Sequence, residues 1–271
     1  VTAATKNLTN WFVNGPSWTV LLMPFENGSN ATFTRDYSGS NNSGRNNGTV
    51  ASSATFSATG GVDGRGAYSF VANGTSNISI ADTTGSTLNL SGNMTITFWM
   101  NASPNDGTFS RIISRRSSGG SGWEFQRNGG TDRLDLRFDT TAGLNQLAIV
   151  VSSIYNNNWH FIATVIDNNT VLSYRDGVLN NTGSFSLGTG IHSNISGTRL
   201  IIGNGVDGGP FNGTIDDVMI FNRSLTAQQI LALYQNRTDL IVAQETGSAG
   251  ENWTACVTPT NTTNEGPTVC S

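Results

Sequence analysis

The chain has 271 residues, a formal net charge of −4 and only 12% charged residues. With 14 basic against 18 acidic residues and no basic cluster, the composition argues against nucleic acid as a partner. No apolar run approaches the ~18 residues of a membrane span, and two His with two Cys are too few for a multi-ligand Cys/His metal site. Asn, Ser, Thr and Gly replace the missing charge and make up nearly half of the chain.

Short β-strands separated by turn residues dominate the predicted structure. Residues 94–100 alternate between apolar and polar side chains, and residues 133–138 alternate strictly, which gives one apolar and one charged face. Residues 171–175 lead into Asp176-Gly177, a dipeptide typical of a type I′ hairpin turn. Further strands are predicted over residues 20–25, 159–165 and 215–221.

One helix is predicted after these strands. Thr226 is its expected N-cap and Gln229 its N3 residue, which together form a capping box, and Leu225 and Ile230 stand at the hydrophobic-staple positions. The helix is expected to end at about Tyr234. Many strands, one late helix and no strand–helix–strand alternation indicate an all-β, antiparallel sandwich.

The chain divides into three parts. Residues 1–17 are a polar N-terminal segment, residues 18–236 are the β-rich body, and residues 237–271 are a tail. The tail holds the chain's two cysteines, Cys256 and Cys270, which we expect to form a disulfide; the alternative is two free thiols. The cysteines lie in two short strands of a predicted hairpin. Because a lone hairpin is marginal in water, it must dock on the body or on a neighbour, or rely on its disulfide.

The asparagines follow a pattern that predicts N-glycosylation. Asn-x-Ser/Thr occurs 18 times, more than twice the number expected by chance from this composition. The alternative is that Asn, Ser and Thr only populate turns, which does not explain their spacing. Glycosylation, a chain that begins at Val1 rather than Met, and a disulfide predict export to an extracellular location. The sites are Asn7, Asn27, Asn30, Asn41, Asn47, Asn73, Asn77, Asn89, Asn93, Asn101, Asn168, Asn180, Asn194, Asn212, Asn222, Asn236, Asn252 and Asn261.

Several segments carry a resemblance when taken in order. They read LMPFENG from residue 22, GVDGRGAYSF from residue 61, MTITFWM from residue 94, WHFIA from residue 159, YRDGV from residue 174 and FNGTIDDVMIF from residue 211. Over residues 18–236 the chain resembles the laminin G-like, concanavalin A-like jelly-roll domains of extracellular proteins. The tail resembles the last hairpin of immunoglobulin-like repeats on archaeal surface proteins, and dense sequons with almost no lysine also look archaeal.

The resemblance implies a structural Ca²⁺ ion, which takes oxygen ligands. By resemblance Asp216 is its best ligand, completed by Glu26, Asp36 and the carbonyl oxygen of Gly66. The alternative is that Asp36 caps a turn and Asp216 bonds nearby backbone. Such an ion would join the first and last strands of the body and would add stability, not catalysis.

Catalytic residues are scarce. Retaining glycosidases need two carboxyl groups about 5–5.5 Å apart, and Glu124, the one Glu in the middle of the body, has no second carboxylate on its strand. Asp132 and Asp135 lie further on, near a turn. His160 and His192 are the only imidazole bases, and His160 is expected to be structural. We therefore expect a protein that is not an enzyme.

Two functions remain. The first is a heavily N-glycosylated extracellular structural protein, a subunit of a cell-surface filament or sheath that self-associates through its terminal segments. The second is a lectin or adhesin module that binds glycans or other cell-surface proteins. Trp123 and Tyr155 are its candidate aromatic platform by position, with a place in the core as the alternative.

Overall fold

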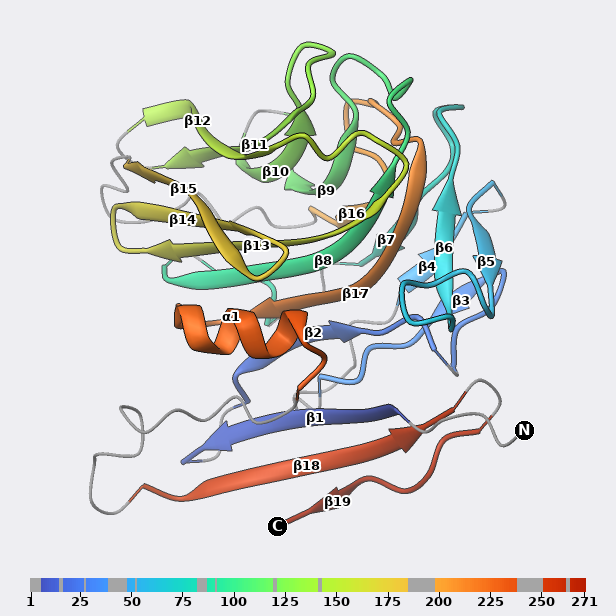
Figure 1. Cartoon of the computed structure of the whole chain (residues 1–271), viewed down its shortest axis with the longest axis vertical. Helices are drawn as coiled ribbons and strands as arrows, with labels where there is room; N and C mark the ends of the chain where they lie inside the picture. Colours follow the sequence, from blue (N-terminus) through green and yellow to red (C-terminus); the bar gives the residue numbers. More distant parts are fainter. Residues whose placement is uncertain are drawn as a thin grey trace.

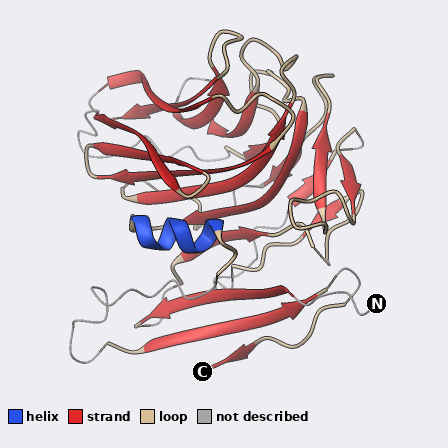
Figure 2. Ribbon diagram, in the orientation of Figure 1, coloured by secondary structure: helices blue, strands red, loops and turns tan. Residues whose placement is uncertain are grey.

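The computed structural model describes most of the chain. The described residues are 6–14, 17–26, 28–38, 48–51, 53–81, 87–90, 92–118, 121–140, 143–184, 198–237, 251–261 and 264–271. The elements they form are three antiparallel sheets and one helix (Figures 1 and 2).

The upper sheet, named from its place in Figure 1, has eight strands. Its spatial order is β12 (Gly143–Ser152), β11 (Arg133–Thr140), β10 (Gly122–Arg127), β9 (Arg111–Arg116), β16 (Leu200–Ile202), β7 (Ile78–Ile80), β4 (Gly48–Val50) and β3 (Phe33–Thr34).

The lower sheet also has eight strands and packs against the upper sheet. Its spatial order is β15 (Val178–Ser184), β14 (Thr170–Arg175), β13 (Trp159–Asp167), β8 (Met94–Ala102), β17 (Gly213–Phe221), β6 (Ala67–Phe70) and β5 (Thr55–Ser57), with β2 (Thr19–Met23) paired to β17 as well.

The main core lies between these two sheets. Met94, Ile96, Phe98 and Met100, the apolar face predicted for residues 94–100, are all 0% exposed. Each such side chain contributes roughly 1.5–3 kcal/mol by leaving water. The predicted turn at Asp176-Gly177 is confirmed, since both residues have positive φ angles, 53° and 79°. The predicted all-β, antiparallel jelly-roll sandwich is therefore confirmed.

The helix α1 (Ala227–Tyr234) begins and ends as predicted. Gln229 N donates to Thr226 Oγ1 at 3.3 Å, and Thr226 N donates to Gln229 Oε1 at 2.8 Å, so the capping box is present. Leu225 and Ile230 are buried against the outer face of the lower sheet. In the described part of the chain no helix is long and apolar enough to cross a membrane.

A third sheet, here called the terminal sheet, joins the two ends of the chain. It consists of β1 (Lys6–Val13), β18 (Trp253–Thr260) and β19 (Val269–Cys270), in that spatial order. β1 and β18 pair from Lys6–Thr260 to Val13–Trp253. The terminal sheet lies below α1 and β2 in Figure 1, with Trp253 edge-on to Trp18 of the body at 5.3 Å. The predicted hairpin thus docks on its own body.

The strand β1 was not predicted. Its buried residues are Lys6, Leu8 and Asn10, whereas Asn7 between them is exposed. Only one of the three inward side chains is apolar, so the period-two hydrophobic pattern that marks a half-buried strand is missing. The strands β1, β18 and β19, which come from opposite ends of the sequence, form one sheet.

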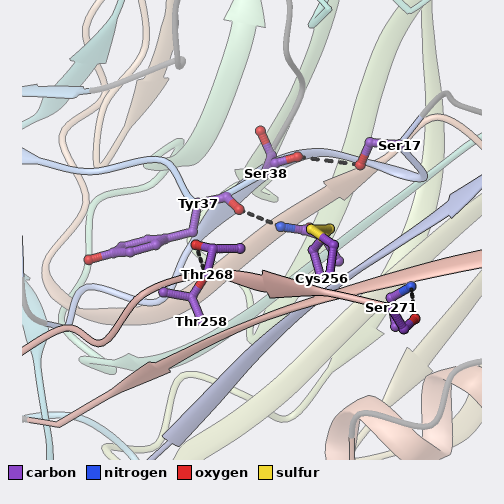
Figure 3. The surroundings of a disulfide bond; sticks show 10 residues. Ser17, Tyr37, Ser38, Cys256, Thr258, Thr268 and Ser271 are labelled. Carbon is purple, nitrogen blue, oxygen red and sulfur yellow. Dashed lines mark hydrogen bonds between the residues drawn. A yellow bond between two sulfur atoms is a disulfide. The ribbon is translucent and has the colours of Figure 1, made fainter.

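The predicted disulfide between Cys256 and Cys270 closes the hairpin β18–β19 (Figure 3). Around it, the hydroxyl groups of Thr258 and Thr268 lie 2.7 Å apart, and Ser271 N donates to the carbonyl oxygen of Ala255 at 3.0 Å. A loop of this length stabilises its segment by about 3 kcal/mol on a chain-entropy argument.

Candidate functional site

Four carboxylates gather where β1 crosses the body. Glu26 follows β2, Asp63 lies in the turn between β5 and β6, and Asp216 and Asp217 are neighbours in β17. Lys6, at the start of β1, reaches into this group. We call these five residues the Lys6 cluster.

A β-bulge aims Asp217 at β1. The pairing of β17 with β8 jumps from Asp216 to Met219, and Asp217 has a φ of 47°. Asp tolerates this left-handed region better than most residues do, and bulges commonly redirect a side chain. As a result the carboxylate of Asp217 meets Lys6, while Asp216 Oδ2 accepts from Val62 N at 3.0 Å.

Lys6 contacts three of the carboxylates directly. Its Nζ lies 2.7 Å from Asp217 Oδ1, 2.8 Å from Asp217 Oδ2, 3.3 Å from Asp63 Oδ2 and 3.4 Å from Glu26 Oε1. The lysine is 7% exposed and Glu26 is 2% exposed. The chain has one lysine, and it is buried among acids.

Burial dominates the electrostatics of this cluster. It raises the pKa of Glu26 to about 7, against the opposing charge of Lys6, and it raises the pKa of Asp217 as well. For Lys6, burial alone would lower the pKa, but the neighbouring carboxylates, Asp217 first, raise it overall. The ammonium is therefore the internal counter-ion of these acids.

The residues predicted to bind Ca²⁺ fall into two groups. Glu26, Gly66 and Asp216 come together, because Gly66 N lies 3.5 Å from Glu26 Oε2 and a methyl group on Gly61 would touch both Asp216 Oδ2 and the carbonyl oxygen of Gly66. Asp36 instead caps a turn, accepting from Leu22 N at 2.9 Å and from Ser38 N at 2.8 Å.

The Lys6 cluster fits a divalent ion poorly. The Lys6 ammonium already lies among the carboxylates, and both oxygens of Asp216 accept backbone N–H groups, from Asp217 and Val62. Within the described residues no group of three or more His, Cys, Asp or Glu has the geometry to hold a metal. Ca²⁺ binding stays a prediction from the resemblance, and the cation seen at this place is Lys6.

A cavity of about 190 Å³ lies beside the cluster, between β1, β17 and the end of α1. Lys6 and Asp217 line one part of it, and Trp99, Phe161 and Tyr234 line another. Trp99 and Tyr234 stack with ring centroids 5.6 Å apart. The cluster therefore borders an apolar, aromatic space.

A second charged group lies on the outer face of β9–β11. Glu124 stands opposite Ser114 and Arg137, whereas its neighbours Trp123 and Phe125 point into the core. The same register puts the four arginines Arg111, Arg116, Arg133 and Arg137 beside Glu124, Asp135 and Asp139. We call this set the arginine face.

Each carboxylate of the arginine face is paired with an arginine. Glu124 Oε2 lies 3.5 Å from Arg111 Nε and Glu124 Oε1 lies 3.5 Å from Arg137 Nη1. Asp139 Oδ2 lies 3.1 Å from Arg116 Nε, and Asp135 Oδ1 lies 2.8 Å from Arg133 Nε. From the sequence, a second carboxylate was considered only on the strand of Glu124. Asp135 and Asp139 were therefore not found, because they reach the same face from the neighbouring strand β11.

A pocket of about 370 Å³ adjoins the arginine face, within the size range of ligand pockets. Its lining includes Arg116, Ser117, Ser118, Thr198, Arg199 and Ile201. Arg199 is exposed. Two guanidinium groups and three hydroxyl groups lie beside two aliphatic side chains, Ile201 and Val206, a set suited to an anionic ligand that also has an apolar part.

The two candidate aromatic residues lie in the core, which was the stated alternative to an aromatic platform. Trp123 is 2% exposed and Tyr155 3% exposed, and both belong to the core between the sheets. His160 has a structural place, with Nδ1 3.0 Å from Asp176 Oδ2 at the β14–β15 turn. His192 lies outside the described residues.

Fourteen of the 18 sequon asparagines fall in the described residues, and none of these is buried. By contrast Asn10 and Asn204, which are not in sequons, are 5% and 4% exposed. At Asn73 the side-chain oxygen accepts from the N–H and hydroxyl of Thr75, so this sequon also forms a turn. The other four, Asn27, Asn41, Asn47 and Asn194, lie outside the described residues.

Comparison with known proteins identifies the fold family. The laminin G-like family described as the concanavalin A-like lectin/glucanases superfamily matches residues 71–231, more than half of the chain. The chain belongs to this family. No curated protein matches its sequence.

Solved structures of toxin binding domains share the fold. The binding domain of botulinum neurotoxin serotype G is 20% identical with a TM-score of 0.61, covering 80% of this chain and 50% of that one. The binding domain of Paraclostridial Mosquitocidal Protein 1 is 18% identical with a TM-score of 0.60, covering 80% and 51%. That of botulinum neurotoxin serotype D is 15% identical with a TM-score of 0.59, again covering 80% and 51%. The chain spans about half the length of each.

Proposed function

We propose that this chain is a non-catalytic, N-glycosylated module of the extracellular surface that binds anionic glycans at the pocket beside the arginine face. The family and the binding domains that share its fold support a binding role. The disulfide fits an oxidising, extracellular location.

The distribution of sequons carries the proposal. No sequon falls between Asn101 and Asn168, although this stretch contains six asparagines. At the chain's average density, these 66 residues would hold about four sequons. The stretch includes all of β9–β12, and therefore all seven residues of the arginine face. The three half-buried arginines of this face, Arg111, Arg133 and Arg137, therefore lie on strands without a predicted glycan and are the part of the face open to a ligand.

The charges point to the class of ligand. The chain as a whole is acidic, at −4, yet four arginines meet three carboxylates on this face and Arg199 adds a further positive charge at the pocket. Arginine forks match carboxylate and sulfate groups. We expect sugars that carry such groups to bind and neutral sugars to bind weakly.

The test is a titration of the native protein with uronic-acid or sialylated oligosaccharides and with their neutral counterparts. Binding of the acidic sugars, reduced at least about tenfold in Arg199→Gln, supports the proposal. The matched control is Arg237→Gln, which removes an exposed arginine near the end of α1. Equal binding of acidic and neutral sugars, or an effect as large in Arg237→Gln, would contradict it.

The glycan coat is tested separately. Since the described sequon asparagines are exposed or half-buried, they are accessible to modification. We expect native material to exceed the sequence mass of 28.7 kDa by many glycans. A native mass equal to the sequence mass would contradict N-glycosylation of this chain.

A filament subunit is the second candidate. The edge of the terminal sheet favours it, because β19 presents an exposed strand, with Val269 65% exposed, and an open edge can pair with another chain. However, β1 of the same chain already pairs with β18, so the hairpin needs no neighbour to complete it. Electron microscopy of native material decides: regular fibres support this candidate, and only single particles would exclude it.

A further inference from the structure

Lys6 and Asp217 bring a primary amine and a carboxyl group together inside the molecule. Lys6 Nζ is 2.7 Å and 2.8 Å from the two oxygens of Asp217. The carboxyl carbon therefore lies about 3 Å from the nitrogen, a near-attack separation. The two residues are 7% and 8% exposed. An amine and a carboxyl group held in this way are the two partners of an amide bond.

Glu26 completes the group. Its Oε1 lies 3.4 Å from Lys6 Nζ, and the residue is 2% exposed. A carboxyl group this close to the attacking nitrogen is placed to take up its proton and to return it. Such a group both donates and accepts a proton, as general acid–base catalysis requires.

We propose that Lys6 and Asp217 condense after folding into an intramolecular isopeptide bond between β1 and β17, with Glu26 transferring the proton. The neutral amine of Lys6 attacks Cγ of the protonated Asp217 carboxyl group. A C–N bond forms, and Glu26 passes a proton from the nitrogen to a hydroxyl group of the tetrahedral intermediate. That C–O bond breaks and one water leaves. Glu26 ends as it began, and nothing is oxidised or reduced.

The surroundings favour this product. In water the ammonium and carboxylate ions are strongly solvated, but burial removes that solvation and penalises both charges. An amide carries no charge. The adjoining cavity of about 190 Å³, which Lys6 and Asp217 line, has room for the water molecule that the reaction releases.

The residue type at position 6 also fits. The chain has 14 basic residues and one lysine, so arginine stands at the other thirteen positions. Arginine is better suited to a buried ion pair with carboxylates, whereas only lysine offers a nucleophilic primary amine. An ion pair alone does not require lysine at the one place where the chain keeps it.

The starting geometry sets the pace of the reaction. The two Asp217 oxygens are nearly equidistant from the nitrogen, so the whole carboxyl group must tilt, by rotation about Cα–Cβ, before the face of its carbon meets the nitrogen. The carboxylates raise the pKa of Lys6, so the ammonium must first give up a proton. We therefore expect the bond to accumulate after folding, not during it.

The intact mass of the folded chain, produced in a host that adds no N-glycans, tests the proposal. We expect the mass to fall with time to that of the disulfide-bonded chain minus one water. We also expect Lys6, the chain's one ε-amine, to stop reacting with an amine reagent even after denaturation. Asp217→Ala and Lys6→Arg should keep the full mass, and Glu26→Gln should slow the loss at least about tenfold.

Lys6→Arg also controls for succinimides, which remove one water at Asp-Gly pairs such as Asp176-Gly177. A loss of water that persists in Lys6→Arg would overturn the proposal. So would folded wild-type protein that keeps its full mass and a reactive Lys6, which would leave an ion pair.

Discussion

The Lys6 cluster and the arginine face are both groups of buried charges on strands, but they differ in balance and in place. The Lys6 cluster sets one lysine against four carboxylates between two parts of the chain. The arginine face sets four arginines against three carboxylates on one continuous sheet, beside a pocket. We propose that the first holds the molecule together and that the pocket beside the second binds a ligand.

Removing the lysine is expected to have the largest effect on stability. Relative to freshly folded wild type, in which Lys6 is still an ammonium, Lys6→Met leaves four carboxylates without their cation, and breaking a buried pair from one side costs about 3–5 kcal/mol. Chemical denaturation measures the loss. Arg199→Gln, at the edge of the arginine face, should change stability by less than about 0.5 kcal/mol. Similar losses of unfolding free energy in Lys6→Met and Arg199→Gln would contradict the view that only the Lys6 cluster stabilises the fold.

The pH dependence of stability should follow Glu26. Its folded pKa of about 7 lies above the ordinary value of 4.5, so the folded protein keeps a proton that the unfolded chain releases. Its contribution is therefore complete below about pH 4.5 and is lost as the pH rises through about 7, by at most about 3 kcal/mol. Lys6, Asp63, Asp217 and the N–H of Gly66 face this carboxyl group.

Glu26→Gln is the matching variant, because glutamine keeps the shape but does not titrate. Its stability curve between pH 4.5 and 7 should be flatter than that of the wild type. An unchanged slope would show that another group controls this pH range.

Metal removal should have little effect on the wild type. In freshly folded protein, before the proposed bond forms, the Lys6 ammonium supplies the cation of its cluster, so EDTA should leave the melting temperature unchanged within about 1 °C. In Lys6→Met, added Ca²⁺ should restore part of the lost stability, because an ion that binds only the folded state stabilises it. A clear drop in the wild-type melting temperature with EDTA would instead favour the Ca²⁺ ion that the family resemblance implies.

Much of the fold could be predicted from the sequence because its signals are local. Alternation placed the strand at residues 94–100, Asp176-Gly177 marked the hairpin, and Thr226 marked the helix start, each through contacts within a few residues. β1 could not be predicted, because its inward residues Lys6 and Asn10 are polar and gain their partners from residues far along the chain.

The sites were harder for the same reason. The sequence singled out Glu26 and Asp216, but nothing in it linked Lys6 to Asp217, 211 residues away. Neither did it show that β11 carries Asp135 and Asp139 to the face of Glu124, since that depends on strand register. The one available signal was compositional: Lys6 is the single lysine among 14 basic residues, which marks its position as unusual.

Cleavage at methionine tests the central claim that Lys6 fixes β1 to the body. The four methionines, Met23, Met94, Met100 and Met219, put Lys6 and Asp217 in different cyanogen bromide fragments, 1–23 and 101–219. After reduction and denaturation of mature, unglycosylated protein, we expect these two fragments to remain joined, lighter than their sum by one water. Recovery of free fragment 1–23 in full yield would contradict the account.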